Sequence, residues 1–347
     1  MDNRKRLLPF ATGLLLLGVA FFLLYQRPVH VEFSGATMGT SYLIKISALS
    51  RETSQNAIEQ QTFAVLDQVD HLMSTYKADS DISRFNRSEI DQPVQFNRQT
   101  LDLVRLSKSI YERSNGSFDI TVAPVVRLWG FGPEIKEDTL PSTADINRAL
   151  DTVGFNKIQV SEYPPTLTKI DKVEIDLSAI AKGYGVDQVA ELFAREGIEN
   201  YLIEVGGEIR VKGTNKEGQL WRIGIETPSL VRTGARQAVA IHNLSIATSG
   251  DYRNFFEIAG KRYSHTINPV TGRPVDHGLA SVTVVMPSCA EADAYATALS
   301  VLGPDEGYRL AEEMNLSAYF LVRDGEDYQE IITTGFRDLL ENQSIQQ

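Results

Sequence analysis

The order of helix-like and strand-like segments is the feature that most constrains how this chain can fold. Apolar residues recur at helical spacing in four long segments, 53–73, 101–114, 179–196 and 291–302. Segments with strand character are 33–46, 173–177, 201–205, 208–212, 220–226, 237–247, 280–286, 317–322 and 329–333. A doubly wound parallel sheet needs strands and helices in regular alternation, which this order lacks. The sequence therefore predicts an α+β fold, with 347 residues for one large domain or two interlocked lobes.

The N-terminal segment has the composition of a membrane anchor. Residues 4–25 read RKRLLPFATGLLLLGVAFFLLY, so three cations precede about 19 almost wholly apolar residues. That length is close to the ~20 residues with which a helix crosses a bilayer. No A-x-A cleavage pattern follows, and cations retained in the cytoplasm direct the rest of the chain outward. We expect an uncleaved anchor at 1–27, with a buried helix of a soluble fold as the alternative.

The anchor divides the chain into an anchored tip and an exported part. We expect a tether at 28–32, a single domain at 33–335 on the periplasmic side of the inner membrane, and a tail at 336–347. The net charge is −11, and it becomes −14 once residues 1–27 are left out. A nucleic acid partner is not expected, because nothing would offset the repulsion of its phosphates. Cys289 is the single cysteine, so no disulfide forms within the chain.

One histidine lies in a segment dense in turn-forming residues. His265 belongs to the run YSHTINPVTGRP at 263–274, which contains Asn-Pro, Thr-Gly and Arg-Pro pairs. Such residues fix a backbone in a turn. A rigid loop that displays an imidazole is what a general base requires, because the ordinary pKa of histidine is near ~6.5. The alternative is a histidine that caps a turn.

A carboxylate and a hydroxyl share one face of a predicted helix. Asp293 and Thr297 are four residues apart and are flanked by alanines, which allow a ligand to approach closely. These are hard oxygen ligands, suited to Mg²⁺ or Ca²⁺ rather than Zn²⁺. The alternative is an aspartate that stabilises the helix N-terminus.

The segment 176–187, with the sequence DLSAIAKGYGVD, passes from a predicted strand into a predicted helix. Backbone groups exposed at such a helix start can hold an anion or a metal. Lys182 in the first turn opposes the helix dipole and indicates a phosphate or carboxylate nearby. The two glycines cost about 1 kcal/mol each within a helix, which indicates close packing or the approach of a ligand. A helix packed tightly on a sheet is the alternative.

Aromatic residues near turns suggest a site for a flat ring. The segment GSFDITVAP at 116–124 leads to WGFGP at 129–133, and Met38 and Tyr76 lie in other turn-rich loops. An ordinary aromatic core explains these residues equally well. The chain contains neither a G-x-x-x-x-G-K-[ST] nor a G-x-G-x-x-G motif, so no common nucleotide-binding fingerprint is present.

Taken together, these segments resemble the ApbE family, the FAD:protein FMN transferases. The resemblance covers roughly residues 33–335 and rests on several motifs in one order. These motifs are TMGT at 37–40, MSTY at 73–76, SRFN at 83–86, FD at 118–119, WGFG at 129–132, 176–187, GG at 206–207, TSGDYR at 248–253, the His265 loop and 293–297. It implies two interleaved α/β lobes with the flavin site between them.

The resemblance also implies a role for individual residues. His265 would be the catalytic base, and the Ala179 carbonyl, Asp293 and Thr297 would bind Mg²⁺. The FAD site would be lined by Met38, Tyr76, Ser117, Phe118, Asp119, Asp176, Lys182 and Ile267.

The implied reaction is a Mg²⁺-dependent transfer of FMN from FAD to a Thr or Ser hydroxyl of an exported flavoprotein, which forms a phosphoester and releases AMP. Hydroxyl activation and neutralisation of phosphoryl charge are the tasks of a base and a metal. Two alternatives remain, an FAD pyrophosphatase that produces FMN and AMP, and an exported flavin-binding protein without turnover. We expect the acceptors to be subunits of membrane redox complexes.

Overall fold

The computed structural model describes residues 29–50, 52–131, 140–227, 235–250, 255–258, 261–325 and 327–344. The anchor expected at 1–27 lies outside these residues. Within the described ranges, no helix is both long enough and apolar enough to cross a membrane. The anchor therefore stays a prediction.

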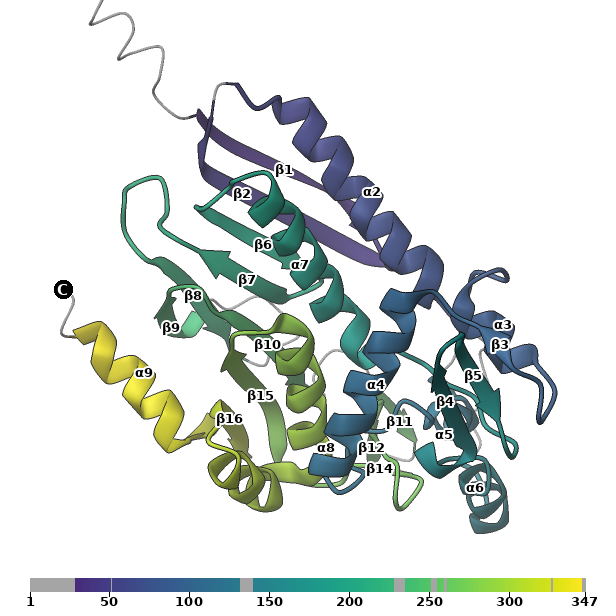
Figure 1. The fold of residues 1–347 in the computed structure, drawn as a ribbon. Coiled ribbons are helices and arrows are strands. Elements are labelled where there is room, and N and C mark those ends of the chain that lie inside the picture. The colour runs from purple at the N-terminus through teal and green to yellow at the C-terminus, as the bar shows by residue number, and fades with distance from the viewer. Residues whose placement is uncertain are drawn as a thin grey trace, which may run out of the picture.

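An eight-stranded sheet forms the centre of the fold (Figure 1). Its strand order is β1-β2-β6-β7-β10-β15-β16-β17. The strands are β1 (Val29–Thr37), β2 (Thr40–Leu49), β6 (Tyr201–Val205), β7 (Glu208–Lys212), β10 (Ser245–Gly250), β15 (Leu279–Met286), β16 (Ser317–Asp324) and β17 (Asp327–Ile332). Each neighbouring pair is antiparallel. An antiparallel sheet with helices gathered on a face is the α+β arrangement that the order of segments predicts.

Long helices cover one face of this sheet, and they lie in front of the strands in Figure 1. They are α2 (Gln55–Met73), α7 (Ser178–Arg195) and α8 (Cys289–Glu313), with α4 (Arg98–Arg113) packed against α8. Leu66 of α2 and Phe193 of α7 share a core with Ile44 of β2. Farther along the sheet, Ala298 of α8 shares a core with Val284 of β15. These apolar stripes explain the helical periodicity of the sequence.

The opposite face is covered by the hairpin β8 (Trp221–Glu226) and β9 (Ala235–Ile241) and by α9 (Thr334–Ser344). Tyr319 of β16 packs there with Phe336 of α9, whereas the next residue, Phe320, faces the helix layer. This alternation is the period-two pattern of a strand that is buried on both faces. Helix α9 crosses residue 335, where the domain was expected to end, and it packs on the sheet with Phe336 completely buried.

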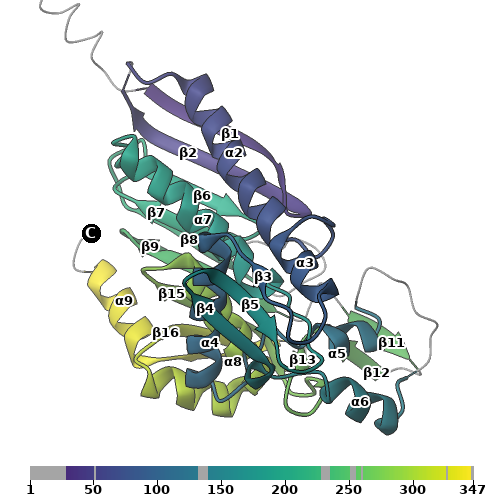
Figure 2. The same cartoon turned by 45° about the vertical axis from the view of Figure 1, so that its right-hand side comes forward.

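Shorter elements form a smaller lobe at the end of the molecule away from β1 (Figure 2). It contains a three-stranded sheet of order β3-β5-β4. Its elements are α3 (Asp81–Arg87), β3 (Val94–Gln95), α5 (Ala123–Leu128), α6 (Thr143–Leu150), η1 (Phe155–Lys157), β4 (Ile158–Glu162), β5 (Pro165–Lys169), β11 (Phe255–Ile258), β12 (Lys261–Ser264), β13 (Ile267–Asn268) and β14 (Arg273–Pro274). The chain enters this lobe after α2, after α4 and after β10, so the two parts are interleaved in sequence.

The prediction of a strand at 173–177 is wrong. This segment pairs with a side chain and a single carbonyl rather than with a strand. Asn86 accepts from the Ile175 amide and donates to its carbonyl, both at 2.8 Å, and the Asp176 amide donates to Ile120 O at 2.7 Å. Val173, Ile175 and Leu177 are buried nonetheless. The alternating pattern therefore reflects burial and not membership of a sheet.

Two other segments differ from the predicted elements: one predicted strand is two strands, and one predicted helix is followed by a second helical stretch. The strand expected at 237–247 is β9 and β10, separated by a turn in which Asn243 has a φ of 55°. Helix α8 bends at Gly303, whose φ of 80° is not helical and which directly follows the helix predicted at 291–302. A second helical stretch then continues to Glu313, which the sequence analysis did not predict.

Candidate active site

The site is built on a close crossing of α7 and α8. A Cβ atom at Gly183 would lie 2.3 Å from the carbonyl oxygen of Cys289, so no larger residue fits at this crossing. Asp187 of α7 accepts hydrogen bonds from the amides of Cys289 and Ala290, each at 3.0 Å, and from Ser288 Oγ at 2.9 Å. A carboxylate from one helix thus caps the N-terminus of the other and fixes their relative position.

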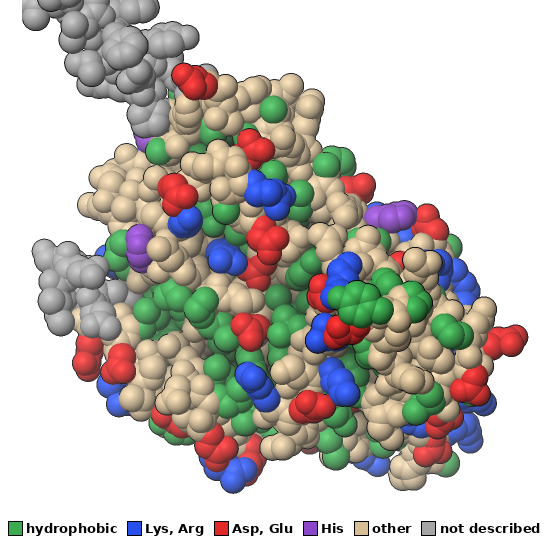
Figure 3. All heavy atoms as spheres, in the orientation of Figure 1, with side chains coloured by type: hydrophobic (Ala, Val, Ile, Leu, Met, Phe, Trp, Pro, Cys, Tyr) green, Lys and Arg blue, Asp and Glu red, His purple; other side chains and the backbone are tan. Residues whose placement is uncertain are grey.

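Three charged side chains meet beside this crossing. On the outer helix-covered face, acidic and basic side chains are interspersed (Figure 3). Here, by contrast, Lys182 Nζ lies 3.5 Å from Asp293 Oδ2 and 3.4 Å from Glu208 Oε1. Asp293 Oδ2 also accepts from the Gly183 amide at 3.1 Å. Both carboxylate side chains are 5% exposed, so one ammonium group faces two buried carboxylates.

Burial controls the ionisation of this cluster. Burial lowers the pKa of Lys182, but the negative charges of Asp293 and Glu208 outweigh it and raise the pKa overall. Burial raises the pKa of Glu208, and the nearby charge of Asp293 raises it further. The pKa of Asp293 is also raised by burial, although Lys182 and the Gly183 amide act in the opposite direction. The cluster therefore contains one positively charged group for two acidic groups.

A cavity of about 410 Å³, which we call the polar cavity, adjoins the cluster. Most of the residues proposed from sequence line it: Ser117, Phe118, Asp119, Asp176, Ala179, Lys182, His265, Ile267, Asp293 and Thr297. The structure thus brings the expected base, the expected metal ligands and most of the expected flavin contacts into one space.

A second cavity of about 560 Å³, the aromatic cavity, contains the other two predicted flavin contacts, Met38 and Tyr76. Asp176, Ser178 and Lys182 line both cavities, so the two spaces adjoin at the start of α7. The polar cavity contains the buried carboxylates Asp293 and Glu208, and the aromatic cavity contains the ring of Tyr76. Each volume lies within the ~300–1,000 Å³ typical of small-molecule sites.

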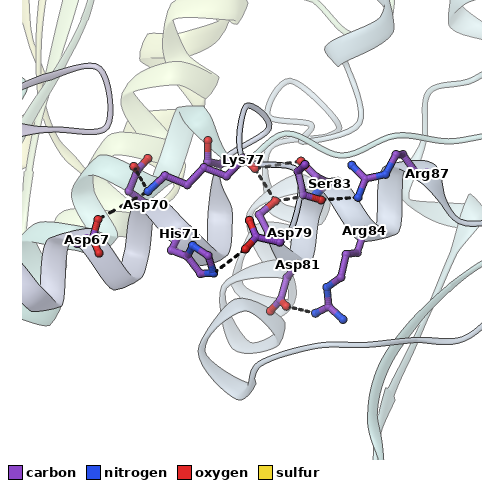
Figure 4. A network of polar contacts seen from close by, with 12 residues as sticks. Asp67, Asp70, His71, Lys77, Asp79, Asp81, Ser83, Arg84 and Arg87 are labelled. Carbon is purple, nitrogen blue, oxygen red and sulfur yellow. Dashed lines mark hydrogen bonds and ion pairs between the residues drawn. The ribbon is translucent and has the colours of Figure 1, made fainter.

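The loop that carries Tyr76 is held in place although its ring is 78% exposed. Lys77 Nζ lies 2.7 Å from Asp70 of α2, and Ser80 Oγ donates to the Ser74 carbonyl at 2.6 Å. Figure 4 shows Lys77 extended toward Asp70 and Asp67 of α2. An exposed aromatic ring on a fixed loop is suited to stacking against a planar ligand.

Two polar groups in the polar cavity have unusual surroundings. Asp119 is 7% exposed, and its Oδ1 accepts from the amide and hydroxyl of Thr121 at 2.8 and 2.7 Å. Burial raises the pKa of Asp119 to about 6, although the two bonds from Thr121 act against it. Ser117 Oγ is buried and has no hydrogen-bond partner among the described residues. A buried hydroxyl without a partner is expected where a ligand completes the site.

The His265 loop is held by hydrogen bonds within the loop and to α5. The Thr266 amide donates to Ser264 Oγ at 3.1 Å, and the Gly272 amide donates to Asn268 O at 2.8 Å. Trp129 Nε1 donates to Gly272 O at 2.8 Å and ties the loop to α5. The half-buried imidazole lies edge-on to Phe131, with 6.3 Å between ring centres.

The expected metal ligands fit a divalent cation that binds oxygen. No group of three or more His, Cys, Asp or Glu side chains with metal-binding geometry occurs in the described part of the chain. The expected set is instead mixed, with the Asp293 carboxylate, the Thr297 hydroxyl and the Ala179 carbonyl on one cavity. Glu208 Oε2 is buried and has no hydrogen-bond partner among the described residues. An excess carboxylate charge in a buried site favours a cation.

Sequence reasoning missed Glu208 and gave Ser249 no role. Glu208 begins β7, directly after the Gly206–Gly207 turn, and Ser249 Oγ lies 3.3 Å from Thr297 Oγ1. Both residues line the polar cavity. The carboxylate next to two glycines, which turn the chain sharply at φ values of 62° and 106°, is the signal that could have identified Glu208.

Comparisons with known proteins agree on one family. The model of the ApbE family matches residues 38–320. An FAD:protein FMN transferase of Vibrio cholerae is 39% identical over 339 residues, which cover 97% of this chain and 99% of the relative. The FAD:protein FMN transferase of Haemophilus influenzae is 40% identical over 326 residues, covering 90% of this chain and 92% of the relative.

Solved structures show the same fold. The flavin transferase ApbE from Vibrio cholerae superposes with a TM-score of 0.82 at 38% identity, covering 90% of this chain and 99% of that one. The apo form of Pseudomonas stutzeri flavinyl transferase ApbE gives a TM-score of 0.83 at 36% identity, covering 90% and 97%. With a family model that matches most of its length and relatives near 40% identity, this chain belongs to the ApbE family.

Proposed function

We propose that this enzyme of the ApbE family transfers FMN from FAD to a Thr or Ser hydroxyl of exported flavoproteins, in a Mg²⁺-dependent reaction that releases AMP. The observation that carries the proposal is that His265, Asp293 and Lys182 line one cavity, which adjoins the cavity of Tyr76. Its relatives with this fold are FAD:protein FMN transferases and flavin transferases.

The two adjoining cavities would hold FAD from end to end. The isoalloxazine ring would stack on Tyr76 and contact Met38 in the aromatic cavity. The pyrophosphate would lie near Lys182 at the junction of the two cavities, where a positive charge attracts it. Ser117, Asp119 and Ile267 would contact other parts of the dinucleotide in the polar cavity.

Asp293, Thr297 and the Ala179 carbonyl would hold Mg²⁺. When bound, the ion would neutralise negative charge on the phosphoryl oxygens as the pyrophosphate is split. Asp187 and Gly183 contribute by fixing α8 against α7, which sets the distance from Asp293 to Lys182.

In the transfer step, His265 would accept the proton of the acceptor hydroxyl. The hydroxyl oxygen would form a bond to the phosphorus on the FMN side, and the bond from this phosphorus to the bridging oxygen would break. The electron pair of that bond leaves with AMP. General base catalysis of this kind contributes about 10²–10⁴-fold to the rate.

The proposal includes the location of the enzyme in the cell. Residues 1–27 would anchor the enzyme in the inner membrane with residues 33–335 on the periplasmic side, where subunits of membrane redox complexes would be the acceptors. Labelling by a membrane-impermeant reagent in intact spheroplasts tests this orientation. Protection of the folded domain from the reagent would contradict it.

The activity is tested with the full chain, FAD, Mg²⁺ and an exported flavoprotein domain. AMP release is followed together with the flavin fluorescence of the acceptor on a denaturing gel. We expect AMP and a fluorescent acceptor band. AMP with free FMN alone would instead indicate the pyrophosphatase, and FAD binding without AMP would indicate the flavin-binding protein.

A further inference from the structure

Glu208 has no role in the reaction described above, although its carboxyl group is buried and only partly paired. The side chain is 5% exposed and faces Lys182 with one oxygen, while the buried Oε2 has no hydrogen-bond partner among the described residues. Burying a carboxylate with an unpaired oxygen destabilises a protein. An apolar residue would avoid this penalty, so the presence of an acidic residue at this position calls for an explanation.

The explanation lies in a conflict at Asp293. Lys182 Nζ and the Gly183 amide both approach Asp293 Oδ2, at 3.5 and 3.1 Å. An ammonium group and a divalent cation compete for the same carboxylate, because each is attracted by its negative charge. Lys182 bound to Asp293 would therefore oppose the metal that Asp293 is proposed to hold.

Glu208 offers Lys182 a second position. The ammonium group lies almost equally far from the two carboxylates, at 3.4 Å from Glu208 and 3.5 Å from Asp293. A Cβ atom at Gly206 would lie 3.1 Å from Lys182 Cδ, so the stem of the lysine is confined against the turn that precedes Glu208. Because the two distances are nearly equal, a small shift would move the ammonium group from Asp293 to Glu208, while its stem stays against the turn.

We propose that Glu208 is a positioning residue, which takes Lys182 from Asp293 and thereby frees Asp293 to bind the divalent cation. The unpaired Oε2 becomes a second acceptor for the ammonium group after this shift. This inference rests on the proposed function, because it assumes that Asp293 binds the metal. It assigns Glu208 no contact with the metal itself.

The test is a double-mutant cycle on the affinity for Mn²⁺ alone, measured with the full chain by electron paramagnetic resonance. Glu208→Gln should weaken Mn²⁺ binding about tenfold, because Lys182 then remains on Asp293. In the Lys182→Met background, the same substitution should have no effect on the affinity. Glu204→Gln is the matched control, since Glu204 lies before the same turn but outside the polar cavity.

A direct role of Glu208 as a metal ligand predicts a different pattern, in which Glu208→Gln weakens binding equally in both backgrounds. That pattern, or unchanged affinity in the chain that retains Lys182, would overturn the inference. Lys182→Met alone provides an independent check, because removal of the competing ammonium should tighten Mn²⁺ binding; weaker binding would also overturn the inference.

The inference and the proposed function fail in different ways. If the unaltered chain binds no Mn²⁺, the metal site itself is refuted and the inference falls with it. If the unaltered chain binds Mn²⁺ and transfers FMN, but the cycle shows no coupling between Glu208 and Lys182, the proposed function stands and the inference alone is wrong. Thermal unfolding of each variant establishes that the fold is retained.

Discussion

The polar and aromatic cavities adjoin at Lys182, but they are built in opposite ways. The polar cavity contains buried charges on a packed helix and a strand of the central sheet, and Asp293 and Glu208 are each 5% exposed. The aromatic cavity presents Tyr76, 78% exposed, on a loop pinned by polar contacts. Electrostatic stabilisation of a reaction is strongest when the charged groups are held away from water. Stacking on a planar ligand requires an accessible face of an aromatic ring. Under the proposed function, the polar cavity would be the reacting end of the site, and the aromatic cavity would be the end that recognises FAD.

The strongest test of this division is His265→Ala. We expect kcat to fall about 10²–10⁴-fold because the acceptor hydroxyl loses its base, while the Kd for FAD stays unchanged. AMP release and equilibrium fluorescence measure the two quantities. His242→Ala is the control, since His242 is exposed in the turn between β9 and β10. A proportionate loss of FAD affinity would show that recognition also depends on the reacting end.

Gly183→Ala examines the scaffold of the polar cavity. The added Cβ would lie 2.3 Å from a backbone carbonyl, so α7 and α8 must separate. We expect the free energy of unfolding to fall by about 1–3 kcal/mol and transfer activity to fall with it, as measured by urea denaturation and AMP release. Gly185→Ala is the matched control, because its Cβ meets the flexible end of Met38. Equal stability of the two variants would contradict this account.

Asp119 gives the polar cavity a dependence on pH. Because burial raises its pKa from 3.8 to about 6, the folded protein retains a proton that the unfolded chain has lost between these values. The contribution of Asp119 to stability is therefore full below about pH 4 and falls as the pH rises through 6, by at most about 3 kcal/mol. Asp119→Asn should remove this dependence in urea denaturation from pH 4 to 7. Identical pH profiles for the two proteins would refute the assignment.

The smallest effect is expected for substitutions of Tyr76, which should change only the affinity for FAD. Tyr76→Ala should weaken FAD binding by about 1 kcal/mol, roughly fivefold, and Tyr76→Phe should retain it. The free energy of unfolding should stay the same, because the ring is exposed. Fluorescence titration and urea denaturation measure both. A drop in kcat at saturating FAD would remove the distinction between the two ends.

The periodic pattern of apolar residues predicted where helices and strands lie, but it did not predict which segments pair with each other. The periodic helices and the strands at 201–205 and 208–212 appear where the sequence indicated them. The segment at 173–177 was misassigned because a buried extended chain has the same pattern whether it pairs with a strand or with Asn86. The small lobe and the sheet order depend on contacts far apart in sequence, which periodicity does not report.

The candidate site followed the same rule. Twelve residues implied by the family resemblance line two adjoining cavities. Glu208 was missed because its importance comes from Lys182 and Asp293, which approach it from two other elements. The roles of the twelve residues stay predictions until they are tested.

The strand order also sets when the site can form during synthesis. Tyr42 of β2 pairs with Val205 of β6, and β15 must be made before it can take its place beside β10. Asp293 comes later still, on α8. Such distant pairings fold slowly, because long loops must close before their contacts stabilise the chain. A nascent chain that stops short of α8 lacks Asp293, so the expected metal ligands can come together only after α8 has been made.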